Sequence, residues 1–376
     1  MSKKTILQFG ALGALLALPA AVQAGECQAT PFACAVDQAI QAGLQHWRNV
    51  ERGSGSFTGG RDVRHNFFGI LSFLEKRQGV GWQGQVQGYD GMDPNDQQLV
   101  VRAMTALING DPSLTNPNQV PYTYVTGGNL MALSVYIATN GPDDIGAAVT
   151  VNQALANGVV ALQRAQGMGN QAWSYNGPGT DLSTTQFAVA GLAAGENLIE
   201  GASATLAQLP QFLMANTTVA DGGLQYNPGS GSSSSMTASG IWCYRLSQVP
   251  AGDPRVQGAL GWMRQNYTYD RMIGGFAPTS TFYYQWAMTK SMAVSADDGL
   301  GGAIYAESFG DRDPGALGYP EEPANEYFDV AYTLLQWQDA NGYFGSGFGG
   351  APNGWDGESS HGFALLTLER SLGGVC

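Results

Sequence analysis

The chain has 376 residues, of which 12% are charged and 10% are aromatic, and its formal net charge at pH 7 is −13. An acidic surface repels phosphate backbones and anionic lipid, which excludes nucleic acid and membrane surfaces as expected partners. A low density of charge combined with many aromatic residues is typical of a folded extracellular protein and not of a disordered one.

The N-terminal segment 1–24 has the pattern of a secretory signal peptide. Lys3 and Lys4 precede an apolar run of about a dozen residues, and residues 22–24 (VQA) form a small-x-small cleavage motif. That run is shorter than the roughly 20 residues needed to span a membrane, and no later segment is long enough either. We therefore expect residues 1–24 to be removed, residues 25–376 to fold as one domain, and the mature protein to be periplasmic or secreted.

Four cysteines follow this segment. Cys27, Cys34 and Cys376 lie at the chain ends, where one disulfide could tie the two termini together. Cys243 lies in a helical pattern and is expected to be a small buried hydrophobic side chain. The sequence has neither a CxxC pair nor a Cys/His zinc spacing, and its three histidines are too few for an all-His metal site. We expect no bound metal and no cofactor.

A unit of two helices joined by a loop rich in glycine and aromatic residues repeats along the chain, at residues 32–77, 154–196, 206–249, 253–293 and 325–372. The second helix of each unit is apolar nearly all round, whereas the first carries polar stripes. No unit can bury its own apolar face, so neighbouring units must share a core. Residues 80–126 fit less well and predict long loops around one helix at 96–109. Concentric inner and outer helices predict an all-α fold, an α/α toroid of about five to six helical hairpins.

The order of outer helix, glutamine, Gly-aromatic loop and inner helix resembles the prenyltransferase and squalene-cyclase repeat. The strongest matches are VVALQRAQ…WSYNGPGTDLSTTQFAVAGL, TLLQWQDANGYF…HGFALLTLER and ADGGLQYNPGSGSSSSMTASG. The resemblance covers residues 32–373, and FYYQWAMTKSM also looks like a helix of secreted bacterial members. It implies the α/α-toroid fold of that superfamily.

The catalytic motifs of that superfamily are absent from the sequence. The acidic pairs at 143–144 and 297–298 lie in turn patterns and lack the third aspartate of the DxDD motif of squalene-hopene cyclases. His361 begins a late inner helix, where the zinc-binding histidine of protein prenyltransferases would lie. The FYYQWAM helix, however, lacks the matching Asp and Cys, and the thioester motif of complement-like toroids is also missing. The resemblance therefore implies a fold and not a chemistry.

Asp181 stands directly before the inner helix of the WSYNGPGTD copy. Serines at 232–235, and Thr279 with Ser280, take its place in the next two copies. Residues that exchange among Asp, Ser and Thr before a helix are N-caps, because each offers an oxygen to free N–H groups. Ser183 and Gln186 also fit the S-x-x-Q capping box. We expect Asp181 to cap a helix and not to act as a catalytic acid.

His65 and His361 begin inner helices in the first and last units, which are neighbours in a closed toroid. Both imidazoles would then face one end of the central cavity, beside Asp62, Asp356 and Glu358. There they could hold a metal or act as acid and base, or they could only bond loop carbonyls. Asp356 and Glu358 could also form a glycosidase carboxylate pair, but two carboxyls in one flexible loop reach the required spacing trivially.

Aromatic side chains are frequent on the inner helices and could line an apolar or sugar-stacking pocket, with core packing between the layers as the alternative. The candidate ligand-binding residues are His65, Gln186, Trp242, Tyr283, Tyr284 and Trp286.

Two functions stay open on the sequence alone, and so does the question whether the protein is an enzyme. The missing motifs favour a non-catalytic toroid that binds an apolar or carbohydrate ligand in its central cavity, or serves as a scaffold for a protein partner. The alternative is an enzyme acting on an isoprenoid or polysaccharide, with His361 and Asp62, Asp356 or Glu358 as acid and base. Export disfavours cyclase and prenyl-transfer chemistry, because diphosphate substrates are intracellular.

Overall fold

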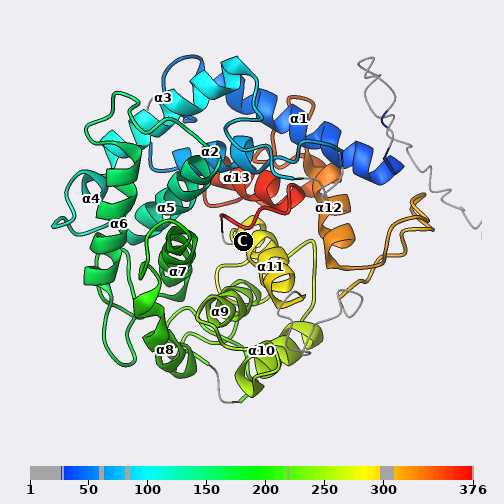
Figure 1. The fold of residues 1–376 in the computed structure, drawn as a ribbon. Coiled ribbons are helices and arrows are strands. Elements are labelled where there is room, and N and C mark those ends of the chain that lie inside the picture. Colours follow the sequence, from blue (N-terminus) through cyan, green and yellow to red (C-terminus); the bar gives the residue numbers. More distant parts are fainter. Residues whose placement is uncertain are drawn as a thin grey trace, which may run out of the picture.

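The computed structural model describes residues 27, 29–58, 63–80, 85–217, 220–296 and 309–374. Over these residues the chain is all-α, and its extended segments form only isolated bridges. Six helices form an inner ring (Figure 1): α2 (Asn66–Glu75), α5 (Thr123–Ala138), α7 (Leu182–Glu196), α9 (Ser234–Leu246), α11 (Thr281–Ala296) and α13 (Gly357–Leu368). Around it lie α1 (Pro31–Glu51), α3 (Pro94–Gly110), α4 (Pro112–Thr115), α6 (Val151–Ala165), α8 (Leu209–Ala215), α10 (Pro254–Gln265) and α12 (Glu326–Trp337).

The inner ring is closed. Each inner helix packs against the inner helices before and after it, and α13 packs against α2. Among the outer helices, α3 packs mainly on α2, α6 on α5 and α10 on α9, in each case the inner helix that precedes it in the chain. Outer and inner helices alternate along the described residues and make six hairpins. This confirms the predicted α/α toroid. The segment 80–126 contains the predicted helix as α3, but α5 begins within it at Thr123, so this segment belongs to a full hairpin.

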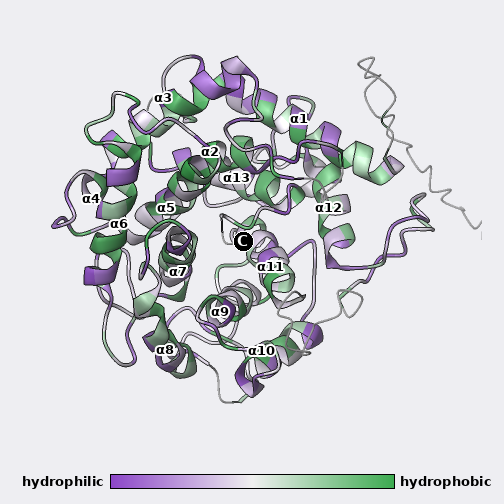
Figure 2. Ribbon diagram, in the orientation of Figure 1, coloured by the Kyte–Doolittle hydropathy of each residue, from purple (hydrophilic) through white to green (hydrophobic). Residues whose placement is uncertain are grey.

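Hydropathy separates the two layers. Outer helices are two-sided: on α6, Leu155 and Leu162 are buried while Gln153 and Arg164 face solvent. Figure 2 shows the hydrophilic residues of α3 and α6 on their outward sides. The inner helices are buried on nearly every face, which explains their lack of polar stripes.

The inner helices α5 and α7 approach closely at Gly127 and Gly191. A Cβ atom built on Gly127 would lie 2.3 Å from the carbonyl oxygen of Phe187. A Cβ atom on Gly191 would lie 2.6 Å from the carbonyl oxygen of Gly127. Only glycine at these two positions allows the two backbones to come this close.

Asp181 is the N-cap of α7, as predicted. Its Oδ1 accepts hydrogen bonds from Thr184 N at 3.0 Å and Ser183 Oγ at 2.7 Å. The predicted capping box of Ser183 and Gln186 is wrong, because the side chain of Gln186 does not bond the backbone at the start of the helix. Gln186 is fully buried and accepts a hydrogen bond from Ser239 Oγ at 2.6 Å. The side chain of Gln186 therefore joins α7 to α9 within the inner ring.

The segment after α13 turns towards the centre of the inner ring (Figure 1). Glu75, at the end of α2, accepts hydrogen bonds there from Ser371 Oγ and from the backbone N–H groups of Gly373 and Gly374. Gly373 lies against Met131 and Lys290 of two other inner helices. One end of the ring is thus covered by the chain's own last described residues.

Cys27 forms a disulfide with Cys34, seven residues along the chain. The sequence suggested that a bridge among Cys27, Cys34 and Cys376 ties the two termini together. That expectation is wrong for Cys27 and Cys34, because their disulfide closes a short loop. Cys376 lies outside the described residues, as do segment 1–24 and Asp62. Cys243 is buried as a free thiol, as predicted. Over the described residues, none of the helices combines the length and the apolar character that crossing a membrane requires.

Candidate functional site

A cavity of about 280 Å³ opens at the N-terminal ends of four inner helices, α2, α5, α7 and α13. We call this cavity the mouth. Its lining consists of Arg64, His65, Tyr122, Tyr124, Val125, Tyr175, Ser183, Phe187, Trp355, Asp356 and Ser359. Because the first residues of parallel inner helices meet at one end of the ring, residues far apart in sequence converge here.

His65 and Asp356 face each other across the mouth. His65 precedes α2 and Asp356 caps α13, and His65 Nε2 lies 3.9 Å from Asp356 Oδ2. Their side chains are 21% and 37% exposed. The separation is longer than a hydrogen bond. Asp356 is engaged by its own helix, because Oδ1 accepts from Ser359 N at 2.7 Å and Oδ2 accepts from Ser359 Oγ at 2.9 Å.

Exposed aromatic rings stand at the rim of the mouth. Tyr122, Tyr175 and Trp355 are 36%, 40% and 43% exposed. The rings of Tyr122 and Tyr175 lie 5.6 Å apart. The indole of Trp355 is held in place by a 2.7 Å hydrogen bond from its Nε1 to Ser280 Oγ. These rings offer flat apolar faces to solvent beside polar groups of the cavity.

Below the mouth, packed aromatic side chains fill the centre of the ring. Phe187 stacks on Trp286 at 5.3 Å, Trp286 lies 5.1 Å from Phe363, and Phe363 lies 4.7 Å from Phe68. All four side chains are at most 1% exposed. The mouth is therefore shallow and closed below by these rings.

The structure places His361 away from the mouth. Its ring is completely buried against His46, Trp47, Tyr343 and Phe344, and Nε2 lies 3.1 Å from the carbonyl oxygen of Gly43. Burial lowers the pKa of His361 to about 3. The imidazole is therefore neutral near pH 7 and part of the packing between α13 and α1.

Among the predicted acids and bases, the mouth contains His65 and Asp356. Glu358 is not part of its lining and lies within electrostatic reach of His46 and Tyr343. Asp62 lies outside the described residues. The structure thus does not bring His361 and Glu358 together with Asp356 at one point of an open cavity.

The remaining predicted ligand-binding residues lie in the core of the inner ring. Tyr283 OH donates a hydrogen bond to Gln186 Oε1, and Tyr284 OH donates to the carbonyl oxygen of Thr268 at 2.7 Å. Trp242 packs on Trp286 with ring centres 5.4 Å apart. All are buried. Tyr283 joins α11 to α7 and Trp242 joins α9 to α11, while Tyr284 ties α11 to the segment after α10.

The rim residues Tyr122, Tyr175 and Trp355 were missing from the sequence-based candidates. Tyr175 and Trp355 do stand in the Gly-rich loops WSYNGPG and PNGWDG that lead into inner helices. That position is a usable signal, because loops before parallel inner helices open at the same end of a toroid. In the parts of the chain that the structure describes, no group of three His, Cys, Asp or Glu side chains could hold a metal ion.

Solved structures of the same fold include members of two classes of enzyme. Candida albicans protein geranylgeranyltransferase-I, complexed with GGPP, matches with a TM-score of 0.53 and 14% identity over 88% of this chain and 90% of that one. A GH76 alpha-mannanase of Bacteroides thetaiotaomicron matches with a TM-score of 0.51 and 10% identity over 90% and 95%. A family 76 glycoside hydrolase from a bovine strain of that species gives 0.55 and 9% over 90% and 77%.

No protein-family model and no curated protein matches the sequence. At these identities the structural likeness shows the α/α-toroid fold alone.

Proposed function

We propose that this protein is an exported, non-catalytic carbohydrate-binding toroid whose mouth is the binding site. The observation that carries the proposal is the composition of the mouth: exposed Tyr122, Tyr175 and Trp355 stand beside Asp356 and His65. Aromatic faces stack on the apolar faces of sugar rings, and a few polar groups fix their hydroxyls. The Cys27–Cys34 disulfide suits an oxidising compartment outside the cytoplasm.

Carbohydrate is favoured over isoprenoid by the space available. Proteins of this fold include a transferase in complex with GGPP and an alpha-mannanase. An isoprenoid chain needs a long apolar channel, but the centre of this ring is filled by Phe187, Trp286 and Phe363. The mouth is shallow and mixed in polarity, which suits a sugar unit.

Binding without catalysis is favoured by the charged groups. Glycoside hydrolysis uses two carboxyls on either side of the scissile bond. Among the described residues that line the mouth, Asp356 supplies one carboxyl group. Both of its oxygens accept hydrogen bonds from Ser359, as expected of a helix cap.

The test is a titration with neutral oligosaccharides, alpha-mannan oligosaccharides first, followed by tryptophan fluorescence and calorimetry. We expect Tyr175→Ala and Trp355→Ala each to weaken binding by about fivefold, since a lost ring contact is worth roughly 1 kcal/mol. Phe348→Ala removes an exposed aromatic outside the mouth and should bind like the wild type.

Two outcomes would contradict the proposal. Binding of a polyprenyl alcohol in place of every oligosaccharide would favour an apolar ligand. The second outcome is that the wild type releases reducing ends from a glycan and Asp356→Asn does not. The protein would then be an enzyme in which His65 and Asp356 act as acid and base.

A further inference from the structure

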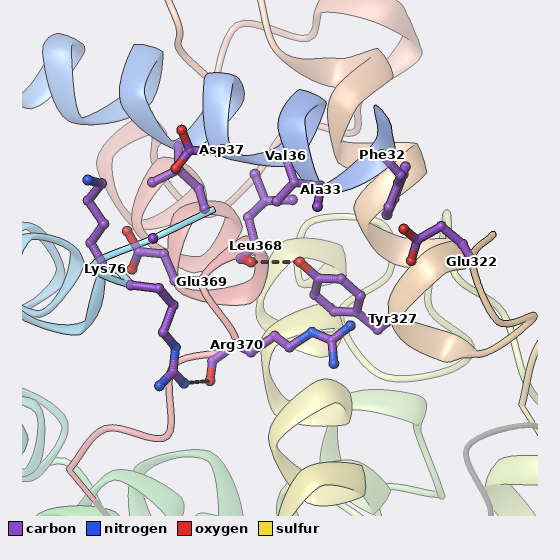
Figure 3. Close-up of a pocket in the computed structure, with 13 residues that line it drawn as sticks. Phe32, Ala33, Val36, Asp37, Lys76, Glu322, Tyr327, Leu368, Glu369 and Arg370 are labelled. Atoms are coloured by element: carbon purple, nitrogen blue, oxygen red, sulfur yellow. Dashed lines mark hydrogen bonds between the residues drawn. The ribbon is translucent and has the colours of Figure 1, made fainter. Parts of the chain in front are cut away.

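A second cavity lies at the end of the toroid opposite the mouth. It has a volume of about 40 Å³ and lies where α1 crosses the C-terminal ends of α2 and α13, beside the start of α12. Figure 3 shows its residues, and we call it the rear cavity. Val36 and Ile40 of α1 and Leu368 of α13, all largely buried, form its apolar wall.

Glu369 brings a buried carboxyl group to the rear cavity. The residue is 1% exposed, and neither carboxyl oxygen has a hydrogen-bond partner among the described residues. Buried polar groups are nearly always bonded, and leaving a carboxyl unsatisfied costs free energy. The neighbouring carboxyl of Glu75 is fully used, because it accepts from Ser371, Gly373 and Gly374. Glu369 is thus the member of this pair that is open to a ligand.

The cationic side chains near Glu369 do not bond its carboxyl group. Figure 3 shows the side chains of Glu369 and Arg370 leaving α13 in opposite directions. The guanidinium of Arg370 stacks on Tyr327, 3.5 Å from the ring centre. Arg77 Nη2 donates to the carbonyl oxygen of Arg370 at 3.5 Å. Lys76 acts on Glu369 through its charge alone.

We propose that the rear cavity binds a small alkylammonium ion, which donates N–H hydrogen bonds to the carboxyl group of Glu369 and packs its carbons on Val36, Ile40 and Leu368. A volume of 40 Å³ holds about three water-sized groups, since one water needs about 10–15 Å³ on this measure. That limits the ion to one or two carbons. An apolar wall opposite one carboxyl suits an ammonium better than a metal ion, which needs several oxygen ligands.

Binding is coupled to the release of a proton. Burial, with the nearby negative charge of Glu75, raises the pKa of Glu369, while Lys76 and Arg77 lower it. Asp37 of α1, Glu322 before α12, and Arg370 complete the charged groups around the cavity. A protonated Glu369 must ionise when the ammonium enters, so affinity rises with pH by up to tenfold per unit. An alkylammonium with a pKa near 10.4, the ordinary value for lysine, remains charged throughout.

The experiment is calorimetric titration of the full-length protein with ethylammonium chloride at pH 6 and pH 8. Two buffers of different ionisation enthalpy report the proton that is released. We expect wild-type protein to bind more tightly at pH 8. Glu369→Gln keeps the shape and loses the charge, and it should bind at least tenfold more weakly without proton release. Glu200→Gln removes an exposed acid elsewhere and should match the wild type.

Val36→Phe fills the cavity while leaving Glu369 in place, so it tests the site independently of the carboxyl and should also lose binding. The proposal is overturned if the wild type does not bind ethylammonium, or if Glu369→Gln binds it equally well. Equal binding of tetramethylammonium, which has no N–H donor, or equal competition by sodium chloride, would likewise overturn it.

Discussion

At the scale of the residue, His361 makes folding sensitive to acid. Its pKa in the folded state is about 3, against an ordinary value of 6.5. Between these values the unfolded chain binds a proton that the folded chain does not. Stability is therefore complete above pH 6.5 and falls as the pH decreases towards 3. From pH 7 to pH 5 this one group should cost about 2 kcal/mol of unfolding free energy.

Urea unfolding at the two pH values checks this expectation. His361→Phe removes the titrating group from a buried aromatic cluster, so its loss of stability from pH 7 to pH 5 should be smaller by that amount. Phe348→Ala changes an exposed aromatic side chain that does not titrate and should keep the wild-type pH dependence. An unchanged pH dependence in His361→Phe would contradict the assignment.

At the scale of the element, the contact between α5 and α7 depends on the absence of side chains. Gly191→Ala would place its Cβ 2.6 Å from the carbonyl oxygen of Gly127, where backbone and not a flexible side chain must move. We expect it to destabilise the protein by about 1–3 kcal/mol in chemical denaturation.

Gly258→Ala on the outer helix α10 is the matched control. Its Cβ would meet nothing within 4 Å, so the same substitution should leave stability unchanged or raise it by up to about 1 kcal/mol. Equal effects at positions 191 and 258 would mean that the two inner helices tolerate a larger separation.

At the scale of the whole molecule, the chain's last described residues cover one end of the ring. A protein ending at Arg370 loses Ser371, Gly373 and Gly374, which are the donors to the buried carboxyl of Glu75. We expect it to be less stable by about 3 kcal/mol, with a lower Tm, because an unsatisfied buried carboxylate costs that order of free energy. A chain ending at Gly374 retains all three donors, and a similar loss in both truncations would argue against this role of Glu75.

The sequence by itself determined the architecture of this protein. Inner helices that are apolar on every face can be buried only between neighbours, so the repeat predicted two concentric layers. Serine and threonine stand at the position of Asp181 in other copies of the repeat, and this local pattern predicted that Asp181 caps its helix. Both conclusions depend on residues close together in the chain, and both are confirmed.

Tertiary structure alone decided which helix-start residues reach the mouth. His65 stands at the N-cap position of α2 and faces open space, whereas His361 lies one turn inside α13, which begins at Gly357, and packs on Gly43 of α1. A local pattern locates a helix start only to within about a turn, and the direction of a side chain depends on how its helix is rotated in the ring. The same limit applies to the inner aromatics: ring-to-ring packing across the centre, between segments far apart in sequence, closes the ring below the mouth.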